Sequence, residues 1–108
     1  MKVAVFGTKV SSEFSSVLQE FFRFFEKNNI DLQLFYPFKE FIKKELHLNV
    51  YHTSVFSSHI DFNPDCKFIF SVGGDGTFLH SVMHIRNFDI PVVGVNSGRL
   101  GFLADISE

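Results

Sequence analysis

The residues of this chain with the clearest chemical potential lie in one short stretch, residues 73–77 (GGDGT), directly after the apolar run 68–72 (FIFSV). Glycines allow positive backbone φ angles and let a ligand approach without a Cβ in the way. A helix expected from Thr77 would offer free amide groups and the positive end of its dipole to phosphate oxygens. The stretch therefore predicts a phosphate-binding loop, and the alternative is a tight turn in which Asp75 only caps the helix.

Asp75 is the unusual member of this loop, because a carboxylate beside a phosphate site is repelled by it. Its presence indicates either a metal ligand or a base that accepts the proton of a hydroxyl group. Two common nucleotide-binding patterns are excluded. The chain has no G-x-x-x-x-G-K-[ST], and Leu79 breaks the G-x-G-x-x-G that would otherwise begin at Gly74.

The stretch 73–77 resembles the GGDGT signature shared by NAD kinases, diacylglycerol kinases and sphingosine kinases and, in variant form, by 6-phosphofructokinases. A second stretch, 94–106 (GVNSGRLGFLADI), is similar to the NAD kinase pattern G-x-N-x-G-x-L-G-F-L. The positions that match this pattern are Gly94, Asn96, Gly98, Leu100, Gly101, Phe102 and Leu103. Lipid kinases usually continue GGDGT with an Asn-Glu pair, whereas this chain continues with Phe78 and Leu79. The chain therefore resembles the N-terminal domain of the NAD kinase family.

The resemblance implies transfer of the γ-phosphoryl group of ATP, or a phosphoryl group of polyphosphate, to the 2′-hydroxyl of the adenosine ribose of NAD. The product would be NADP, and Mg²⁺ or another divalent cation would accompany ATP. By similarity, Asp75 is the catalytic base that takes the proton of the ribose hydroxyl. A permanent cation inside the same loop would oppose that task, so the loop has a carboxylate where other phosphate loops have lysine.

The resemblance also implies a set of binding residues, and no metal ligands among them. The set comprises Gly73, Gly74, Asp75, Gly76, Thr77, Phe78, His80 and Asn96. Thr77 binds a phosphate or caps its helix, Phe78 borders a base pocket or belongs to the core, and Asn96 contacts the ligand or the loop backbone. His80 stands where many NAD kinases carry Arg. A neutral imidazole can donate a hydrogen bond to a phosphate oxygen but lacks the permanent charge and the bidentate fork of Arg.

Hydrophobic periodicity places these residues in an α/β fold with an open, mainly parallel, Rossmann-like sheet and flanking helices. The expected strands are 3–7, 30–36, 50–56 (the weakest pattern), 67–72 and 91–95. The expected helices run from Ser11 or Ser12 to Asn28-Asn29, from Pro37 to about His47, and from Thr77 to about Arg86. In such sheets ligands bind beyond the carboxyl ends of the strands, where the glycine loop would lie.

The length of 108 residues predicts one domain, 1–108, and the β-rich C-terminal domain of the family is expected to be absent from this chain. We therefore expect the fragment alone to be inactive. Hydrophobic residues make up 45% of the chain and the net charge is −2, which predicts neither nucleic acid nor an anionic membrane as a partner. No stretch reaches the ~18 apolar residues of a membrane span. Cys66 is the sole cysteine, as suits a cytoplasmic protein.

Three further interpretations follow from the same residues. The family resemblance implies a homo-oligomer, and the wide apolar face of the first helix is interpreted as a surface for another domain or subunit. A lipid or sugar kinase with the same loop is the alternative enzyme. A non-catalytic, flavodoxin-like binding module is the alternative without chemistry, although a receiver module would place acidic residues where Thr8 and Lys9 follow the first strand.

Overall fold

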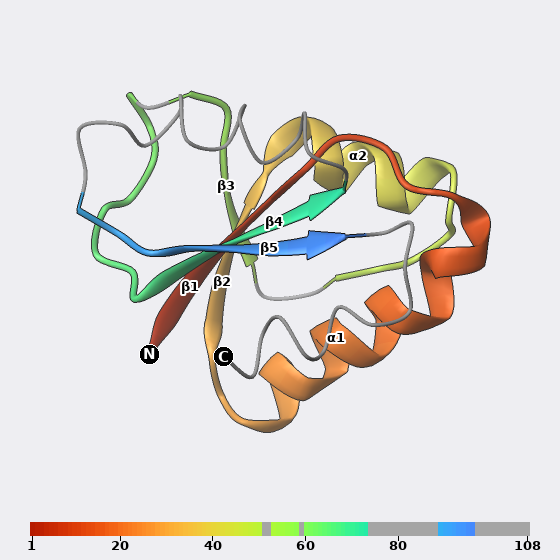
Figure 1. The fold of residues 1–108 in the computed structure, drawn as a ribbon, viewed down its shortest axis with the longest axis horizontal. Coiled ribbons are helices and arrows are strands. Elements are labelled where there is room, and N and C mark those ends of the chain that lie inside the picture. Colours follow the sequence, from red (N-terminus) through yellow and green to blue (C-terminus); the bar gives the residue numbers. More distant parts are fainter. Residues whose placement is uncertain (51–52, 59, 74–88, 97–108) are drawn as a thin grey trace.

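The computed structural model describes residues 1–50, 53–58, 60–73 and 89–96 of the 108. Its strands form a five-stranded sheet in the order β3-β2-β1-β4-β5, and every neighbouring pair is parallel (Figure 1). The strands are β1 (Lys2–Gly7), β2 (Asp31–Phe35), β3 (Thr53–Phe56), β4 (Phe68–Gly73) and β5 (Val92–Asn96). The predicted parallel α/β sheet is therefore confirmed, and the weakest sequence pattern produces the shortest strand.

The first helix, α1 (Ser15–Lys27), follows a 3-10 turn at Ser12–Phe14. Its apolar face was interpreted from the sequence as a docking surface, and this is wrong. Leu18, Phe22 and Phe25 are buried in the same core cluster as the strand residues. The Phe25 ring lies 5.6 Å from the ring of Phe70 on β4. The apolar stripe of α1 therefore covers the protein's own sheet, and Phe24, 59% exposed, is the helix phenylalanine that remains at the surface.

The two ends of α1 differ in how closely they follow the sequence. The helix expected from Ser11 or Ser12 begins as the 3-10 turn and becomes α-helical at Ser15, and the Ser11 side chain makes no capping hydrogen bond. At the other end Asn29 adopts φ 54°, its N–H bonds the carbonyl of Glu26, and the N–H of Ile30 bonds the carbonyl of Phe25. This pair of bonds is a Schellman motif, so the predicted helix end at the two asparagines is confirmed.

The second helix, α2 (Tyr36–Lys44), carries Pro37 in its first turn, where a missing N–H costs nothing. It ends about three residues before the expected His47, which adopts φ 55°. The last turn contains Lys43 and Lys44, whose positive charges interact favourably with the negative end of the helix dipole.

In the described ranges, no helix combines the length and the apolar content needed to cross a membrane.

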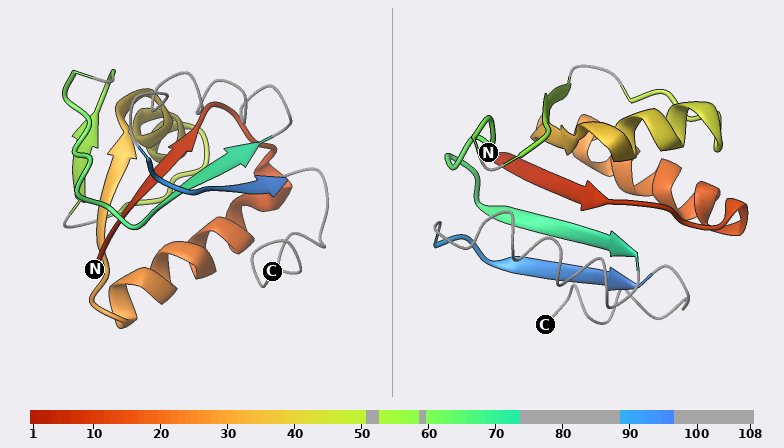
Figure 2. Two further views of the ribbon diagram at one scale, coloured as in Figure 1. Left: turned by 60° about the vertical axis from the view of Figure 1, so that its left-hand side comes forward. Right: turned by 90° about the horizontal axis from the view of Figure 1, so that it is seen from above.

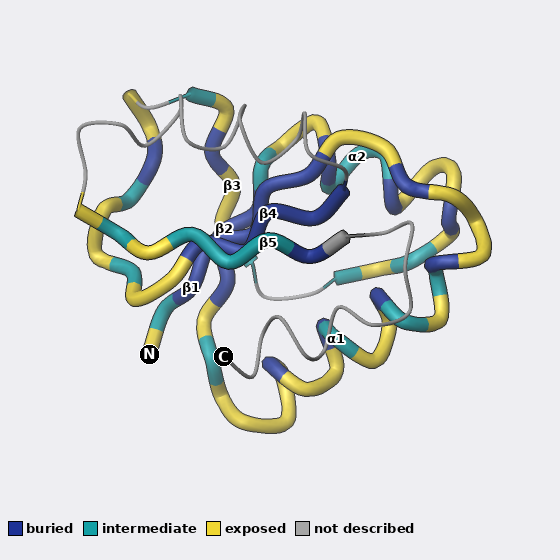
Figure 3. Tube along the Cα trace, in the orientation of Figure 1, coloured by how far each residue is buried: buried dark blue, intermediate teal, exposed yellow. Residues whose placement is uncertain are grey.

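Two apolar clusters pack against the two faces of the sheet, because successive strand side chains alternate in direction. On β1, Val3 and Val5 join the larger cluster with α1 and α2, whereas Ala4 and Phe6 join a smaller one. Figure 2 shows α1 and α2 on the same side of the sheet, and Figure 3 shows the central strands as the most continuously buried part of the chain.

The smaller cluster lies under the connection from β3 to β4, which runs without a described helix. Phe56 and Phe62 pack there with ring centroids 5.0 Å apart. Gln33 anchors this connection to β2: its side-chain amide donates to the carbonyl of Asn63 at 2.6 Å, and its oxygen accepts the Asn63 N–H at 3.0 Å. Since Gln33 is only 1% exposed, these two bonds satisfy a fully buried amide.

Candidate functional site

The carboxyl ends of the strands meet at one edge of the sheet, because all neighbouring pairs are parallel. In the register, Gly7 of β1 faces Val72 of β4, and Gly73 of β4 faces Asn96 of β5. The first residue of GGDGT therefore lies beside the asparagine of the second motif. One residue from each of two stretches that are separate in the sequence thus lies at the edge where ligands bind in this kind of fold.

The strand order also contains a topological switch point between β1 and β4. After β1 the chain moves to β2 on one side, and after β4 it moves to β5 on the other, as the left view of Figure 2 shows. Open α/β sheets bind ligands in the crevice that opens where two such connections diverge. β4 ends at Gly73, so the first residue of GGDGT lies at the carboxyl end of one of the two strands that flank this switch point.

Backbone geometry at the edge explains two of its glycines. Gly73 adopts φ 141°, a conformation that residues with a side chain rarely take, and it is buried at the end of β4. Gly7 ends β1 against the ring of Phe38, and an added Cβ would lie 2.8 Å from the ring carbons. β4 thus ends in a backbone conformation that suits glycine, and Gly7 lets Phe38 in the first turn of α2 pack closely against the end of β1.

Most of the predicted site residues cannot be placed within this geometry. Gly74, Asp75, Gly76, Thr77, Phe78 and His80 lie outside the described residues, as does the helix expected over 77–86. Gly73 is placed at the carboxyl edge. Asn96 is placed there by its backbone as the last residue of β5, and its side chain lies outside the description.

Asp61, which sequence reasoning did not single out, lies in the turn that follows β3. Its carboxylate accepts the N–H of Ser57 at 2.9 Å and that of Ser58 at 2.9 Å. These backbone bonds, that of Ser58 foremost, lower the pKa of the Asp61 carboxyl. The geometry is that of a turn cap, and the described part of the chain brings no three His, Cys, Asp or Glu side chains together as a metal site.

Cys66 lies where the β3–β4 connection reaches the sheet. It is partly buried and free, and burial raises the pKa of its thiol. A thiol with a raised pKa is mostly neutral and therefore a poor nucleophile. Cys66 packs against the smaller apolar cluster and takes no part in the candidate site.

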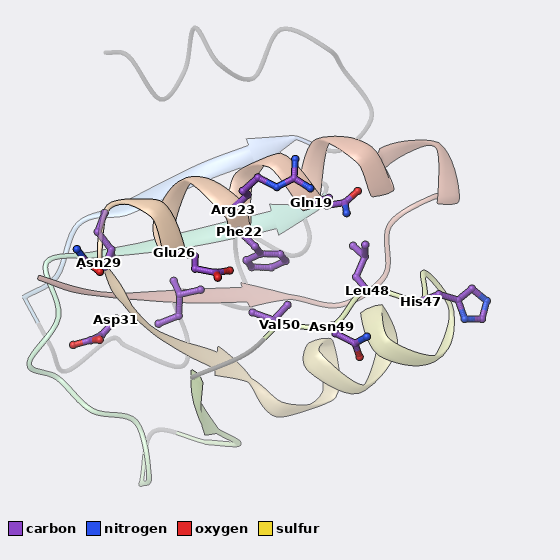
Figure 4. Close-up of a pocket in the computed structure, with 12 residues that line it drawn as sticks. Gln19, Phe22, Arg23, Glu26, Asn29, Asp31, His47, Leu48, Asn49 and Val50 are labelled. Carbon is purple, nitrogen blue, oxygen red and sulfur yellow. The ribbon is translucent and has the colours of Figure 1, made fainter.

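A cavity of about 590 Å³ opens elsewhere, between α1, the start of β2 and residues 47–50 (Figure 4). Phe22, Leu32 and Val50 give it apolar walls, and Glu26 points into it in Figure 4. The guanidinium of Arg23, at its rim, is bonded to Glu20 at 2.8 Å. No lining residue follows the carboxyl end of a strand, so this cavity is separate from the crevice between β1 and β4.

Comparisons with known proteins agree with the motifs at the carboxyl edge. Residues 9–108 match the family described as the ATP-NAD kinase N-terminal domain. The chain is 39% identical over 107 residues to the NAD kinase of Bacteroides fragilis, and 39% identical over 109 residues to that of Flavobacterium psychrophilum. The NAD kinase of Porphyromonas gingivalis is 34% identical over 108 residues.

These alignments cover 97 to 100% of this chain and 35 to 36% of the three relatives. The chain thus spans about a third of the length of the curated relatives it matches. The family match covers residues 9–108, which include every residue of the two motifs. The chain belongs to the ATP-NAD kinase N-terminal domain family.

Proposed function

We propose that this chain is the part of an NAD kinase that holds the reacting ribose, and that the enzyme transfers the γ-phosphoryl group of ATP to the 2′-hydroxyl of the adenosine ribose of NAD. The observation that carries the proposal is the register pair Gly73 and Asn96 at the carboxyl edge. It places the first residue of GGDGT beside the asparagine of the second motif. The relatives cited above, whose alignments cover 97 to 100% of this chain, are named NAD kinases.

In the proposed reaction Asp75 accepts the proton of the ribose 2′-hydroxyl while the oxygen forms a bond to the γ-phosphorus. The bond from that phosphorus to the bridging oxygen breaks, and ADP leaves with the electron pair. A positioned base of this kind contributes about 10²- to 10⁴-fold to a rate. Mg²⁺ enters as part of the MgATP substrate and offsets charge on the triphosphate.

The other residues of the two motifs have binding roles in this proposal. Gly74 and Gly76 shape the loop around the dinucleotide, Thr77 and His80 bind phosphate oxygens, and Phe78 borders a base pocket. The amide of Asn96 contacts the ligand from the neighbouring strand end, a role supported by its place opposite Gly73. The same proposal includes a cytoplasmic, homo-oligomeric enzyme, with polyphosphate as the alternative to ATP as phosphoryl donor.

The proposal is tested on the natural gene product that contains these residues, by measuring NADP formation from NAD and ATP. Asp75→Asn should lower kcat by about 100-fold or more with little change in NAD affinity. The matched control is Asp65→Asn, because Asp65 is an exposed aspartate in the β3–β4 connection, away from the carboxyl edge.

Two results would contradict the proposal. One is phosphorylation of diacylglycerol but not of NAD by the natural gene product, which would favour the lipid kinase alternative. The other is an Asp75→Asn variant with the kcat of the parent protein, since a non-catalytic or merely capping aspartate would behave in this way. A panel of ATP and polyphosphate donors would then establish which donor the enzyme uses.

A further inference from the structure

Lys9 follows the carboxyl end of β1, on the strand next to the one that leads into the glycine loop. β1 ends at Gly7, whose register partner is Val72, the residue before Gly73. Lys9 is two residues beyond Gly7, so the β1–β4 pairing brings it to the switch-point crevice from the side opposite β5. Neighbouring strands lie about 4.8 Å apart, a distance that the four-carbon stem of lysine readily spans.

Lys9 is the one cation in the described part of the chain that lies within two residues of a strand's carboxyl end. Tyr36 and Pro37 follow β2, and Ser57 and Ser58 follow β3. Lys39, further along α2, already donates a hydrogen bond to the hydroxyl of Thr53 at 2.9 Å. Lys9 is exposed and forms no salt bridge with another described residue.

We propose that Lys9 binds phosphate oxygens of a nucleotide in the crevice between β1 and β4. This inference deepens the proposed function and rests on it. A phosphate chain needs positive charge, yet a lysine inside the GGDGT loop would stabilise the carboxylate form of Asp75 and weaken it as a base. A lysine on the neighbouring strand end supplies the charge from outside the loop. Lysine suits this role as a point charge on a flexible stem.

Two sources of phosphate fit the same chemistry: the triphosphate of ATP and the pyrophosphate of NAD. Steady-state kinetics on the natural gene product distinguish them, with ATP varied at saturating NAD and then the reverse. Lys9→Gln should raise the KM for the nucleotide it binds by about tenfold, as expected when one charge-assisted hydrogen bond is lost. The kcat should stay within about twofold, because the contact is present in both the ground state and the transition state.

Two further variants separate a phosphate contact from a structural role. Lys9→Arg keeps the charge and should retain the parent KM within about threefold, since an arginine also binds phosphate. Lys67→Gln removes an exposed lysine from the amino end of β4, at the opposite edge of the sheet, and should leave both KM values unchanged. A larger KM for ATP assigns Lys9 to the triphosphate, and a larger KM for NAD assigns it to the pyrophosphate.

Unchanged KM values for both nucleotides in Lys9→Gln would overturn the inference. So would equal losses in Lys9→Gln and Lys9→Arg accompanied by a lower Tm. If the parent protein makes no NADP, the proposed function fails, and calorimetric titration with inorganic tripolyphosphate then decides on Lys9 alone. If Lys9→Gln binds tripolyphosphate about tenfold more weakly than the parent does, the contact is supported. If the two proteins bind it equally, or if neither binds it, the contact is rejected.

Discussion

Gly73 and Asn96 are register partners across β4 and β5, at the edge where both strands end. This pairing places the first residue of GGDGT beside the asparagine of the second motif. The backbone of Gly73 turns there with φ 141°. The backbone at the end of β4 therefore favours a glycine at this position.

Gly73→Ala should lower both stability and activity. A side chain in this region of φ costs about 1 to 3 kcal/mol in the free energy of unfolding. A displaced loop should reduce kcat/KM for NADP formation by about 10- to 100-fold. Asn29→Ala is the matched control, because Asn29 also has positive φ but lies at the far end of α1. It should lower stability alone, and an active, fully stable Gly73→Ala variant would contradict the prediction.

Gly7→Ala should destabilise the fold through its contact with Phe38. The added Cβ would lie 2.8 Å from ring carbons of a fully buried phenylalanine, and overpacking of this kind costs about 1 to 3 kcal/mol. Phe38→Leu removes part of the ring and makes room. Urea unfolding of both single variants and the double variant should give a favourable coupling energy of at least about 0.5 kcal/mol. If the losses in the two single variants simply add in the double variant, the added methyl group does not clash with Phe38 and the prediction is wrong.

Gln33→Met should loosen the β3–β4 connection. The substitution keeps the shape of the side chain but leaves the N–H and C=O of Asn63 without their partner, at a cost of about 1 to 3 kcal/mol. Amide exchange at residue 63 should accelerate along with the drop in unfolding free energy. Asn63→Asp is the control, because it keeps the side-chain oxygen that accepts the Asp65 N–H and leaves unchanged the main-chain groups that Gln33 contacts. Equal losses in the two variants would assign the effect to the Asn63 side chain instead.

The strands and their parallel arrangement could be predicted from the sequence because continuous apolar runs and helical periodicity are local signals. The strand expected over 3–7 is found at Lys2–Gly7, and the one over 91–95 is found at Val92–Asn96. The order of the strands is not local, since it depends on which surfaces pack together after each crossover. The role of Gln33 is hidden for the same reason: its partner lies 30 residues further along the chain.

The sequence predicted the chemistry of the candidate site but not the spatial arrangement of the strands around it. The glycines and Asp75 indicated a phosphate ligand and a base, but nothing in the sequence indicated that Gly73 pairs with Asn96 or that β1 flanks the loop. For the first helix, the sequence predicted the apolar face correctly, but the surface that it packs against was predicted wrongly. Its apolar face was assigned to a partner because a sequence cannot tell which of several apolar surfaces the sheet will cover, and Phe70 of β4 occupies it.

Cys66 should make the free energy of unfolding fall as the pH rises into the alkaline range. Burial raises the pKa of its thiol in the folded chain, so the folded state keeps the proton to a higher pH than the unfolded state does. As pH rises past the ordinary thiol value of about 8.5, the unfolded state binds fewer protons and the free energy of unfolding falls. Urea titrations at several pH values should show a steeper alkaline loss in the parent than in Cys66→Ala. Parallel curves for the two proteins would contradict this.

The polypeptide of residues 1–108 should not by itself convert NAD to NADP at a measurable rate. The proposed transfer requires two nucleotides held in line, and the chain corresponds to about a third of each NAD kinase it matches. A chimera tests this directly: residues 1–108 replace the 36% of the Bacteroides fragilis enzyme to which they align. The chimera should make NADP, and Asp75→Asn within it should not. The polypeptide alone, mixed with NAD and MgATP, should give no product above background. Turnover by the polypeptide alone at the rate of the chimera would mean that the crevice between β1 and β4 holds both nucleotides unaided.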